Sequence, residues 1–281
     1  YCFFIHKVVQ NKIFSVNKTL RVQGRIIDLS TPAIMGILNI TPDSFYEGSR
    51  AQIVNEILKK AEKMLSEGAT FIDIGGYSSR PGAIDISAEE EWSRVQPAIA
   101  SIRKEFPQAI ISIDTFRSGI ARNAVNEGSD IVNDISAGQL DGEMFSTVAA
   151  FNVPYIAMHM RGNPQTMSTL TDHAVIHQLH ELKVKDIVFD PGFGFAKTVT
   201  QNFELLNNLQ QLHILGKPML VGLSRKSMIW RTLKTTPEQS LNGTTALNTI
   251  ALLKGASILR VHDVKEAREV IELMNQLYSA E

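Results

Sequence analysis

Eight short apolar runs of this sequence each end on, or beside, a polar or ionisable residue. The runs are AIMGILNI (33–40), TFIDIGG (70–76), IISIDT (110–115), DIVNDI (130–135), PYIAMH (154–159), DIVFDPG (186–192), PMLVGLS (218–224) and SILRVH (257–262). Their polar residues are Asn39, Asp73, Asp114, Asn133 with Asp134, His159, Asp190, Ser224 and His262, with Arg260 just inside the last run. Any one of them could be a turn former or a helix cap. Eight such endings together predict a functional site.

Three of these residues suit a flat heterocycle that carries amino and ring N–H donors. The carboxylates of Asp114 and Asp190 accept hydrogen bonds, whereas the amide of Asn133 both donates and accepts. A buried acid that faces a pair of N–H donors, with a lysine nearby, stays ionised and fixes the orientation of the ring. These residue types therefore predict a binding site for a heterocycle.

A second group of residues is cationic. The segment LSRKSM (223–228) contains Arg225 and Lys226 between two serines at the expected start of a helix. Together with Arg260 and His262, this group is suited to phosphate or diphosphate. Barrel enzymes often bind phosphate after their seventh and eighth strands. The alternative interpretation is an ordinary capped helix start with solvated basic side chains.

The apolar runs alternate with helical patterns from about residue 33 to the end of the chain. In IVNEILKKAEKMLSEGA, for example, Ile53, Ile57, Ala61 and Leu65 recur every four residues, and Gly68 follows at a C-cap position. The runs show little apolar/polar alternation, as expected for parallel strands that are buried on both faces. Eight strand-then-helix units predict an α/β protein, a (β/α)₈ TIM barrel over residues 33–281. A doubly wound open sheet is the alternative.

The first thirty residues precede the predicted barrel. They contain TLRVQGRIIDL, which predicts a hairpin-like extension that covers the bottom of the barrel. No linker, low-complexity tract or internal repeat indicates a second domain. We therefore expect residues 1–281 to form a single domain.

Composition narrows the class of protein. The 281 residues are 44% hydrophobic and 20% charged, with 28 basic and 29 acidic side chains, so no nucleic-acid partner is indicated. Cys2 is the single cysteine, which excludes an intrachain disulfide and favours a reducing, cytoplasmic compartment. The apolar start YCFFIHKVV is too short to span a membrane. The first residue is not Met, so we expect the natural start to be missing.

Two loops at the predicted catalytic face differ from routine connections. NITPDSFYEGSR follows the first strand and YSSRPGAIDIS follows the second, and both combine Gly, Pro and Ser with Phe, Tyr or Arg. Such loops can close over a substrate.

Nine motifs, in order from about Leu20 to the C-terminus, together resemble one enzyme family. They are NITPDSF, DIGGYSSRPGA, SIDT, VNDI, MHMRGNPQTM, FDPGFGFAKT, GLSRKS, NGTTALNT and RVHDV. The set is similar to dihydropteroate synthase, the folate-pathway enzyme that sulfonamides target. That family joins 6-hydroxymethyl-7,8-dihydropterin diphosphate to 4-aminobenzoate and releases diphosphate. The resemblance also implies a homodimer with small-molecule substrates and no membrane partner.

The resemblance implies a role for each matching residue. Asp190, Asp114 and Asn133 would bind the pterin ring, with Asp73 supporting them. Lys226 would bridge the two substrates, and Arg260 would pack against the pterin. The diphosphate and Mg²⁺ would be held by Arg260, His262 and Asn39, with Asn39 as the metal ligand. Met158 would line the pterin pocket. The residues that would frame the aminobenzoate are Phe45, Ser79, Arg80, Pro81, Phe195 and Ser227. Gly222 and Arg225 would also bind substrate.

Charge predicts the mechanism. Diphosphate leaves readily once its charge is neutralised, and the dihydropterin delocalises the positive charge left on its methylene group. A dissociative displacement, in which the carboxylates of Asp114 and Asp190 offset that positive charge, needs no covalent enzyme intermediate. Two rival functions share parts of this site: a pterin-binding methyltransferase barrel, which needs no diphosphate cluster, and a non-catalytic paralogue, which would lose the basic residues.

The chain departs from the family pattern in two places. Glu47 stands where the family commonly has Asp. The stretch TDHAVIHQLHELKVKD is shorter than the family's fifth helix, so either that helix is trimmed or a segment is missing from the chain, and the non-Met start favours the second. The same stretch holds His173, His177 and His180, which we expect to lie on solvated helix surface rather than to bind a metal.

Overall fold

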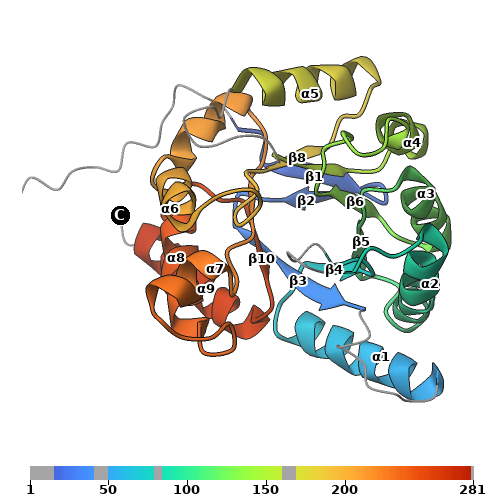
Figure 1. Ribbon diagram of the computed structural model, residues 1–281, viewed down its shortest axis with the longest axis horizontal. Helices are drawn as coiled ribbons and strands as arrows, with labels where there is room; N and C mark the ends of the chain where they lie inside the picture. Colours follow the sequence, from blue (N-terminus) through green and yellow to red (C-terminus); the bar gives the residue numbers. More distant parts are fainter. Residues whose placement is uncertain (1–15, 41–49, 79–83, 160–168, 280–281) are drawn as a thin grey trace, which may run out of the picture.

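The computed structural model, which describes residues 16–40, 50–78, 84–159 and 169–279, contains an eight-stranded parallel barrel surrounded by helices (Figure 1). The strand order is β8-β7-β6-β5-β4-β3-β10-β9. A bridge between Phe189 and Met219 joins the two end strands, and the Phe189 N–H donates to the Pro218 carbonyl at 2.9 Å. The sheet is therefore closed, which confirms the predicted (β/α)₈ barrel and excludes the open sheet.

Each predicted apolar run contains one barrel strand. The strands are β3 (Ala33–Asn39), β4 (Phe71–Gly75), β5 (Ile110–Asp114), β6 (Ile131–Asp134), β7 (Tyr155–Met158), β8 (Ile187–Asp190), β9 (Leu220–Val221) and β10 (Ile258–Val261). Nearly every strand residue is buried, as the lack of apolar/polar alternation predicted, because helices cover the outside and side chains fill the inside.

Helices follow the strands around the outside of the barrel (Figure 1). Residue types at their ends explain where several of them begin. Ser87 caps α2 by accepting from the Glu90 N–H at 3.2 Å, and Thr198 with Gln201 forms a capping box at α6. The helices are α1 (Arg50–Ser66), α2 (Ala88–Glu105), α3 (Ser118–Glu127), α4 (Met144–Phe151), α5 (Thr169–Glu181), α6 (Val199–Asn207), the 3₁₀ helix η2 (Leu209–Leu215), α7 (Ser227–Thr232), α8 (Leu241–Leu253) and α9 (Val264–Ser279). No helix in these ranges is long and apolar enough to cross a membrane.

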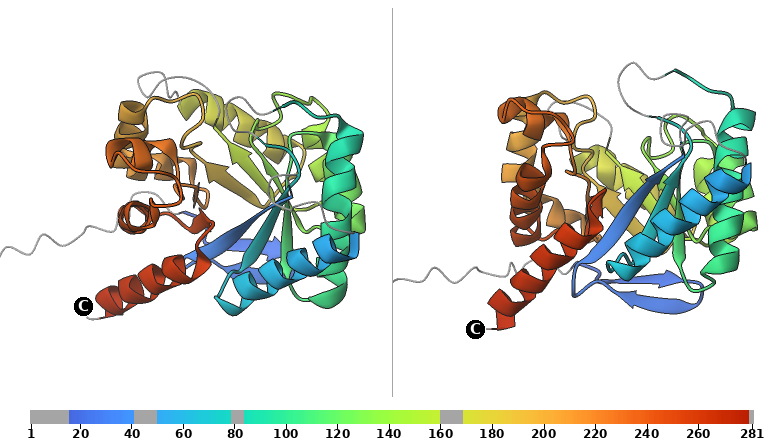
Figure 2. Two further views of the ribbon diagram at one scale, coloured as in Figure 1. Left: turned by 60° about the horizontal axis from the view of Figure 1, so that its bottom comes forward. Right: turned by 90° about the horizontal axis from the view of Figure 1, so that it is seen from below.

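An antiparallel hairpin, β1 (Thr19–Val22) and β2 (Arg25–Asp28), lies across the amino-terminal end of the barrel (Figure 2). Its turn uses Gln23 and Gly24, both at positive φ. Leu20 and Val22 point inward and are buried against a cluster to which all eight barrel strands contribute. The hairpin therefore covers the bottom of the barrel, as the sequence predicted.

That cluster also defines the inside of the barrel, because only there can side chains from eight strands meet. Its strand members are Ala33, Met35, Phe71, Ile110, Ile131, Ile156, Val188, Leu220 and Ile258. A second, larger apolar cluster packs the outer strand faces against the helices. The barrel interior is thus apolar at the end next to the hairpin. Toward the carboxyl ends of the strands, the interior is lined by the residues further along each strand.

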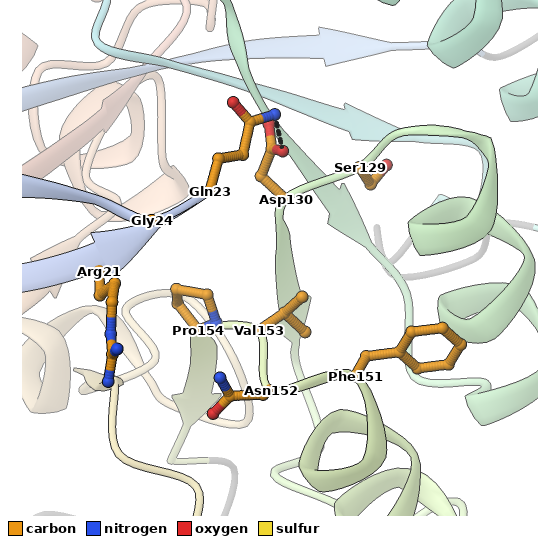
Figure 3. Close-up of a pocket in the computed structure, with 9 residues that line it drawn as sticks. All are labelled: Arg21, Gln23, Gly24, Ser129, Asp130, Phe151, Asn152, Val153 and Pro154. Atoms are coloured by element: carbon orange, nitrogen blue, oxygen red, sulfur yellow. Dashed lines mark hydrogen bonds between the residues drawn. The ribbon is translucent and has the colours of Figure 1, made fainter.

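A pocket of about 330 Å³ opens beside the hairpin, at the amino-terminal end of the barrel (Figure 3). Asp130, which lines this pocket, accepts hydrogen bonds from Gln23, from Arg103 at 2.6 Å and from the Ile111 N–H at 2.8 Å. The pocket is lined by Arg21, Gln23, Gly24, Ser129, Asp130, Phe151, Asn152, Val153 and Pro154. Active sites of barrels lie at the opposite end, so we do not assign the reaction to this pocket.

Candidate active site

The polar site residues occupy the interior layer directly above the apolar cluster. Side chains alternate in direction along a strand, so a residue two positions after an inward one also points inward. Two positions beyond the apolar layer stand Asp73, Ser112, Asn133, Met158, Asp190, Gly222 and Arg260, one from each of seven strands or the turn that follows. Asp73, Asn133, Asp190 and Arg260 therefore lie in one layer, whereas Asp114 points inward two residues further along β5; we call these five residues the polar floor.

Arg260 joins two carboxylates of this floor. Its Nε and Nη2 lie 2.7 and 2.6 Å from Asp73 Oδ2, and its Nη2 lies 2.6 Å from Asp114 Oδ2. Asn133 Nδ2 donates to the same Asp73 oxygen at 3.0 Å. The other Asp73 oxygen, Oδ1, is buried with no hydrogen-bond partner among the described residues. The four side chains form one network that retains an acceptor for a further donor.

Burial and charge set the protonation of this network. Burial raises the pKa of Asp114 to about 7; the Arg260 guanidinium opposes the rise, and the nearby Asp73 carboxylate adds to it. Burial lowers the pKa of Arg260, but the carboxylates of Asp73 and Asp114 outweigh that effect and raise it overall. The guanidinium is therefore always charged, and Asp114 titrates near neutral pH.

Asp190 ends β8 and begins the glycine-rich loop. Its Oδ1 accepts from the Gly192 N–H at 2.7 Å, so this carboxylate does shape the turn as a cap would. Burial raises its pKa, and the Gly192 N–H and the positive charges of Lys226 and Arg260 partly oppose that rise. Gly192 adopts a positive φ of 70° and packs against the His159 carbonyl, so a side chain would not fit there.

Lys226 lies over the same loop. Its Nζ is 4.4 Å from the centroid of the Phe195 ring, a cation–π contact, and its aliphatic stem passes beside Gly194. Lys197 also stabilises the loop by donating to the Gly192 carbonyl at 2.9 Å. The structure thus brings Lys226 and Phe195 together beside Asp190, as the predicted site requires.

Two adjacent pairs of hydrogen-bonded residues connect the loops that follow β9 and β10. Ser224 Oγ lies 3.0 Å from His262 Nδ1, and it also accepts from the His262 backbone N–H at 3.2 Å. One residue further along, the Arg225 guanidinium pairs with Asp263 through two bonds of 3.1 and 2.6 Å. Arg225, which the sequence predicts to bind substrate, thus has its guanidinium paired with Asp263.

The remaining described site residues border this network. A Cβ placed on Gly75 would lie 3.5 Å from Asn39 Oδ1 and 3.7 Å from Asp114 Oδ2, so these two oxygens face the same small space. Gly222 leaves room beside Arg260, whose Cβ would be 3.9 Å from a side chain there. Met158 is buried opposite Asp190 in the strand register, and Ser227 begins α7.

Some predicted residues are not brought together here. Phe45, Glu47, Ser79, Arg80 and Pro81 lie outside the described residues, with most of the two loops that carry them. On α5, His177 Nδ1 lies 3.5 Å from Glu181, and His180 Nε2 lies 2.8 Å from Lys217 Nζ. The described ranges contain no group of three or more potential metal-ligating His, Cys, Asp or Glu side chains.

Two contacts of the site were not foreseen. Asp134, counted among the polar endings, points outward and accepts from Tyr155 Oη at 2.6 Å and from Ser136 and Gly138 N–H groups. Lys197, within the FDPGFGFAKT motif, bonds the Gly192 carbonyl, a contact that the sequence does not predict. Strand alternation could have assigned the outward direction of Asp134 once Asn133 was taken as inward.

Comparison with known proteins identifies the family. A model described as pterin binding enzyme matches residues 35–262. The chain is 39% identical over 275 residues to dihydropteroate synthase of Escherichia coli (strain K12), which covers 93% of this chain and 97% of that protein.

Two solved structures are similar over nearly the whole chain. Dihydropteroate synthase of Xanthomonas albilineans, solved with 4-aminobenzoic acid, has a TM-score of 0.86 at 34% identity, covering 94% of this chain and 99% of that one. The dihydropteroate synthase of Coxiella burnetii in complex with pteroic acid has a TM-score of 0.82 at 38% identity, covering 94% and 100%. By sequence and by structure, this chain belongs to the dihydropteroate synthases of the pterin-binding enzyme family.

Proposed function

We propose that this chain condenses 6-hydroxymethyl-7,8-dihydropterin diphosphate with 4-aminobenzoate to give 7,8-dihydropteroate and diphosphate. The observation that carries the proposal is the interior polar site: Asp73, Asn133 and Asp190 offer acceptors in one layer, Asp114 offers another two residues further along β5, and the cationic Lys226 lies beside Asp190. The two solved relatives support the proposal, because one holds 4-aminobenzoic acid, a reactant, and the other holds pteroic acid, in which a pterin is already joined to aminobenzoate.

The floor would recognise the pterin by its N–H groups. Asp190 Oδ1 is engaged by the Gly192 N–H, so its second oxygen and the unpartnered Asp73 Oδ1 are the acceptors that a donor-rich ring edge would meet. Asn133 is oriented by its bond to Asp73 and presents its amide beside them. Such preorganised acceptors cost little reorganisation when the ring binds.

Charge would assist the departure of diphosphate. Lys226 and His262 lie on the loops after β9 and β10 and would face the diphosphate oxygens as negative charge develops on them. Asp114 and Asp190 would offset the positive charge on the pterin methylene group, which the amine of aminobenzoate then attacks. Because the dihydropterin delocalises that positive charge, the C–O bond to diphosphate can break before the amine nitrogen bonds to the carbon, which makes the displacement dissociative, and the amine then releases a proton.

Mg²⁺ fits the oxygen donors present. Asn39 Oδ1 and Asp114 Oδ2 flank the space beside Gly75, and Mg²⁺ prefers oxygen ligands with the remainder supplied by substrate phosphates and water. We propose Asn39 as the protein ligand. When bound, the ion would neutralise diphosphate charge.

The defining experiment is release of diphosphate. We expect release when both substrates and Mg²⁺ are present, with stoichiometric formation of dihydropteroate, and none when aminobenzoate is omitted. Release without aminobenzoate would indicate a hydrolase, and the absence of both products from a folded protein would refute the synthase.

We also propose that the chain forms a homodimer through α8 and α9. Leu273 and Leu277 lie one turn apart on α9 and are 72% and 60% exposed, and Leu253 on the adjacent α8 is 47% exposed. Exposed apolar residues that gather on neighbouring helices mark interaction surfaces. Sedimentation equilibrium should give a dimer mass, and Leu273→Glu with Leu277→Glu should give a monomer.

A further inference from the structure

Arg225 is placed where a cation would be expected to bind substrate, yet its charge is already matched. Its Nε and Nη2 donate to the two oxygens of Asp263 at 3.1 and 2.6 Å, a bidentate pair. These hydrogen bonds to Asp263 raise the pKa of Arg225 above its ordinary value. The side chains are only 33% and 15% exposed, so the pair is shielded from competing water. Arg225 therefore contributes little net charge to the mouth of the barrel.

The backbone of Arg225 is held in an unusual conformation. Its φ is 56°, in the left-handed region that residues other than glycine rarely adopt. Such a conformation persists only when the surroundings fix it. The Arg225 N–H donates to Thr244 Oγ1 at 3.1 Å, and Thr244 is a buried residue on α8, within the NGTTALNT motif. The Thr244 hydroxyl thus holds the turn from which Lys226 emerges.

The same turn is tied to the loop after β10 at two adjacent positions. Ser224 bonds to His262 and Arg225 bonds to Asp263, so consecutive residues of one loop pair with consecutive residues of the other. Lys226 directly follows Arg225 in the chain, and His262 is itself one of the paired residues; both would interact with the diphosphate. A shift of the Arg225 turn must therefore move both.

We propose that Thr244, Arg225 and Asp263 form a clamp that positions Lys226 and His262 for the diphosphate group. Arg225 is then a positioning residue and not a direct anion ligand. This inference rests on the proposed synthase function. The clamp predicts a selective defect: the diphosphate subsite depends on it, whereas the pterin floor of Asp73, Asn133 and Asp190 lies on other strands.

The test compares two ligands that differ only in the diphosphate. Calorimetric titration of the full chain with 6-hydroxymethylpterin and with its diphosphate, in Mg²⁺, would be done for wild type, Thr244→Val, Thr244→Ser and Thr245→Val. Val replaces Thr with little change of shape and removes the acceptor for the Arg225 N–H. Thr245 is the matched control, because its hydroxyl bonds the Leu241 carbonyl of its own helix at 3.1 Å.

We expect Thr244→Val to bind the diphosphate ligand at least about tenfold more weakly, to bind the bare pterin like wild type, and to be rescued by Ser. Thr245→Val should bind both normally. Equal loss of both ligands would indicate a general structural role, and no loss of either would also overturn the clamp.

Asp263→Asn separates the clamp from direct anion binding, and it does not depend on the Thr244 variants folding. If Arg225 were itself a diphosphate ligand, freeing its charge from Asp263 would leave affinity for the diphosphate unchanged or strengthen it. The clamp predicts that affinity falls. If the wild-type protein bound neither 6-hydroxymethylpterin nor its diphosphate, the proposed function would be refuted. If wild type and Asp263→Asn both preferred the diphosphate ligand to the same degree, only the clamp would be refuted.

Discussion

Asp190 meets two demands at once, and one substitution separates them. The Asp190 carboxylate accepts from the Gly192 N–H at 2.7 Å, and in Asp190→Asn the amide oxygen can still accept this bond, so the turn should be kept. The side chain is 8% exposed, and burial raises its pKa, which means that the folded protein bears a cost for ionising it. A neutral amide removes that cost. We therefore expect the melting temperature to stay within a few degrees of wild type.

Pterin affinity should fall by much more. The second position of the side chain changes from an acceptor to an NH₂ donor, which would face a donor of the ring. Loss of a charge-assisted hydrogen bond costs about 1.5–3 kcal/mol, or about tenfold to 150-fold in affinity. The unsatisfied donors left behind add about 1–3 kcal/mol more. The expected loss is thus at least about tenfold.

The assay is calorimetric titration of the pterin diphosphate, paired with a thermal melt, and Asp134→Asn is its control. Asp134 is also a buried carboxylate at a strand end, but it accepts from Ser136, Gly138 and Tyr155 and points away from the interior. Its amide variant should melt earlier and bind pterin normally. A folded Asp190→Asn with wild-type pterin affinity would refute our account of the floor and leave Asp190 as a cap.

Three further outcomes follow from the same contacts. Lys226→Ala should fold normally and turn over about tenfold to a hundredfold more slowly; wild-type rates would exclude a contact between Lys226 and the substrates. Arg260→Leu should lower the melting temperature more at pH 8 than at pH 5, because it removes the charge that pairs with the Asp73 and Asp114 carboxylates and Asp114 is ionised only at the higher pH; equal losses would contradict this. Pterin affinity of wild type should rise as pH rises through about 7, where Asp114 ionises, and a flat affinity profile would contradict that titration. The contribution of Asp114 to folding stability has the opposite dependence: it is complete below pH 3.8 and is lost as pH rises to about 7.

The strands and their polar ends could be predicted from sequence because both depend on residues that are close together in the chain. An apolar residue near the start of a strand and a polar residue two positions later, such as Ile131 and Asn133, point to the same side by geometry alone. The apolar layer and the polar layer above it were therefore already encoded strand by strand.

Pairing between distant charges could not be predicted in the same way. Arg260 reaches Asp114 across 146 positions of sequence, and Arg225 reaches Asp263 across 38. Residue type indicates only that a guanidinium will find anions, and substrate phosphate and protein carboxylate are equally suitable partners. The directions of the side chains after β9 and β10 decide which of these partners Arg225 binds. Those directions depend on the left-handed backbone conformation of Arg225, which the sequence does not indicate because no glycine stands at that position.

The barrel is a closed ring with one weak seam. Seven of its strand contacts are regular parallel ladders, and the eighth, between β8 and β9, is the single bridge from Phe189 to Met219 within the described residues. The two strand ends at this seam carry Asp190 on one side and the turn to Lys226 on the other. A ligand that contacts both of these ends strengthens the weak contact between β8 and β9. Ligand binding and the β8–β9 contact therefore stabilise each other. Amide exchange at Phe189 should therefore slow on substrate binding, while exchange at Ile72, inside two full ladders, stays unchanged.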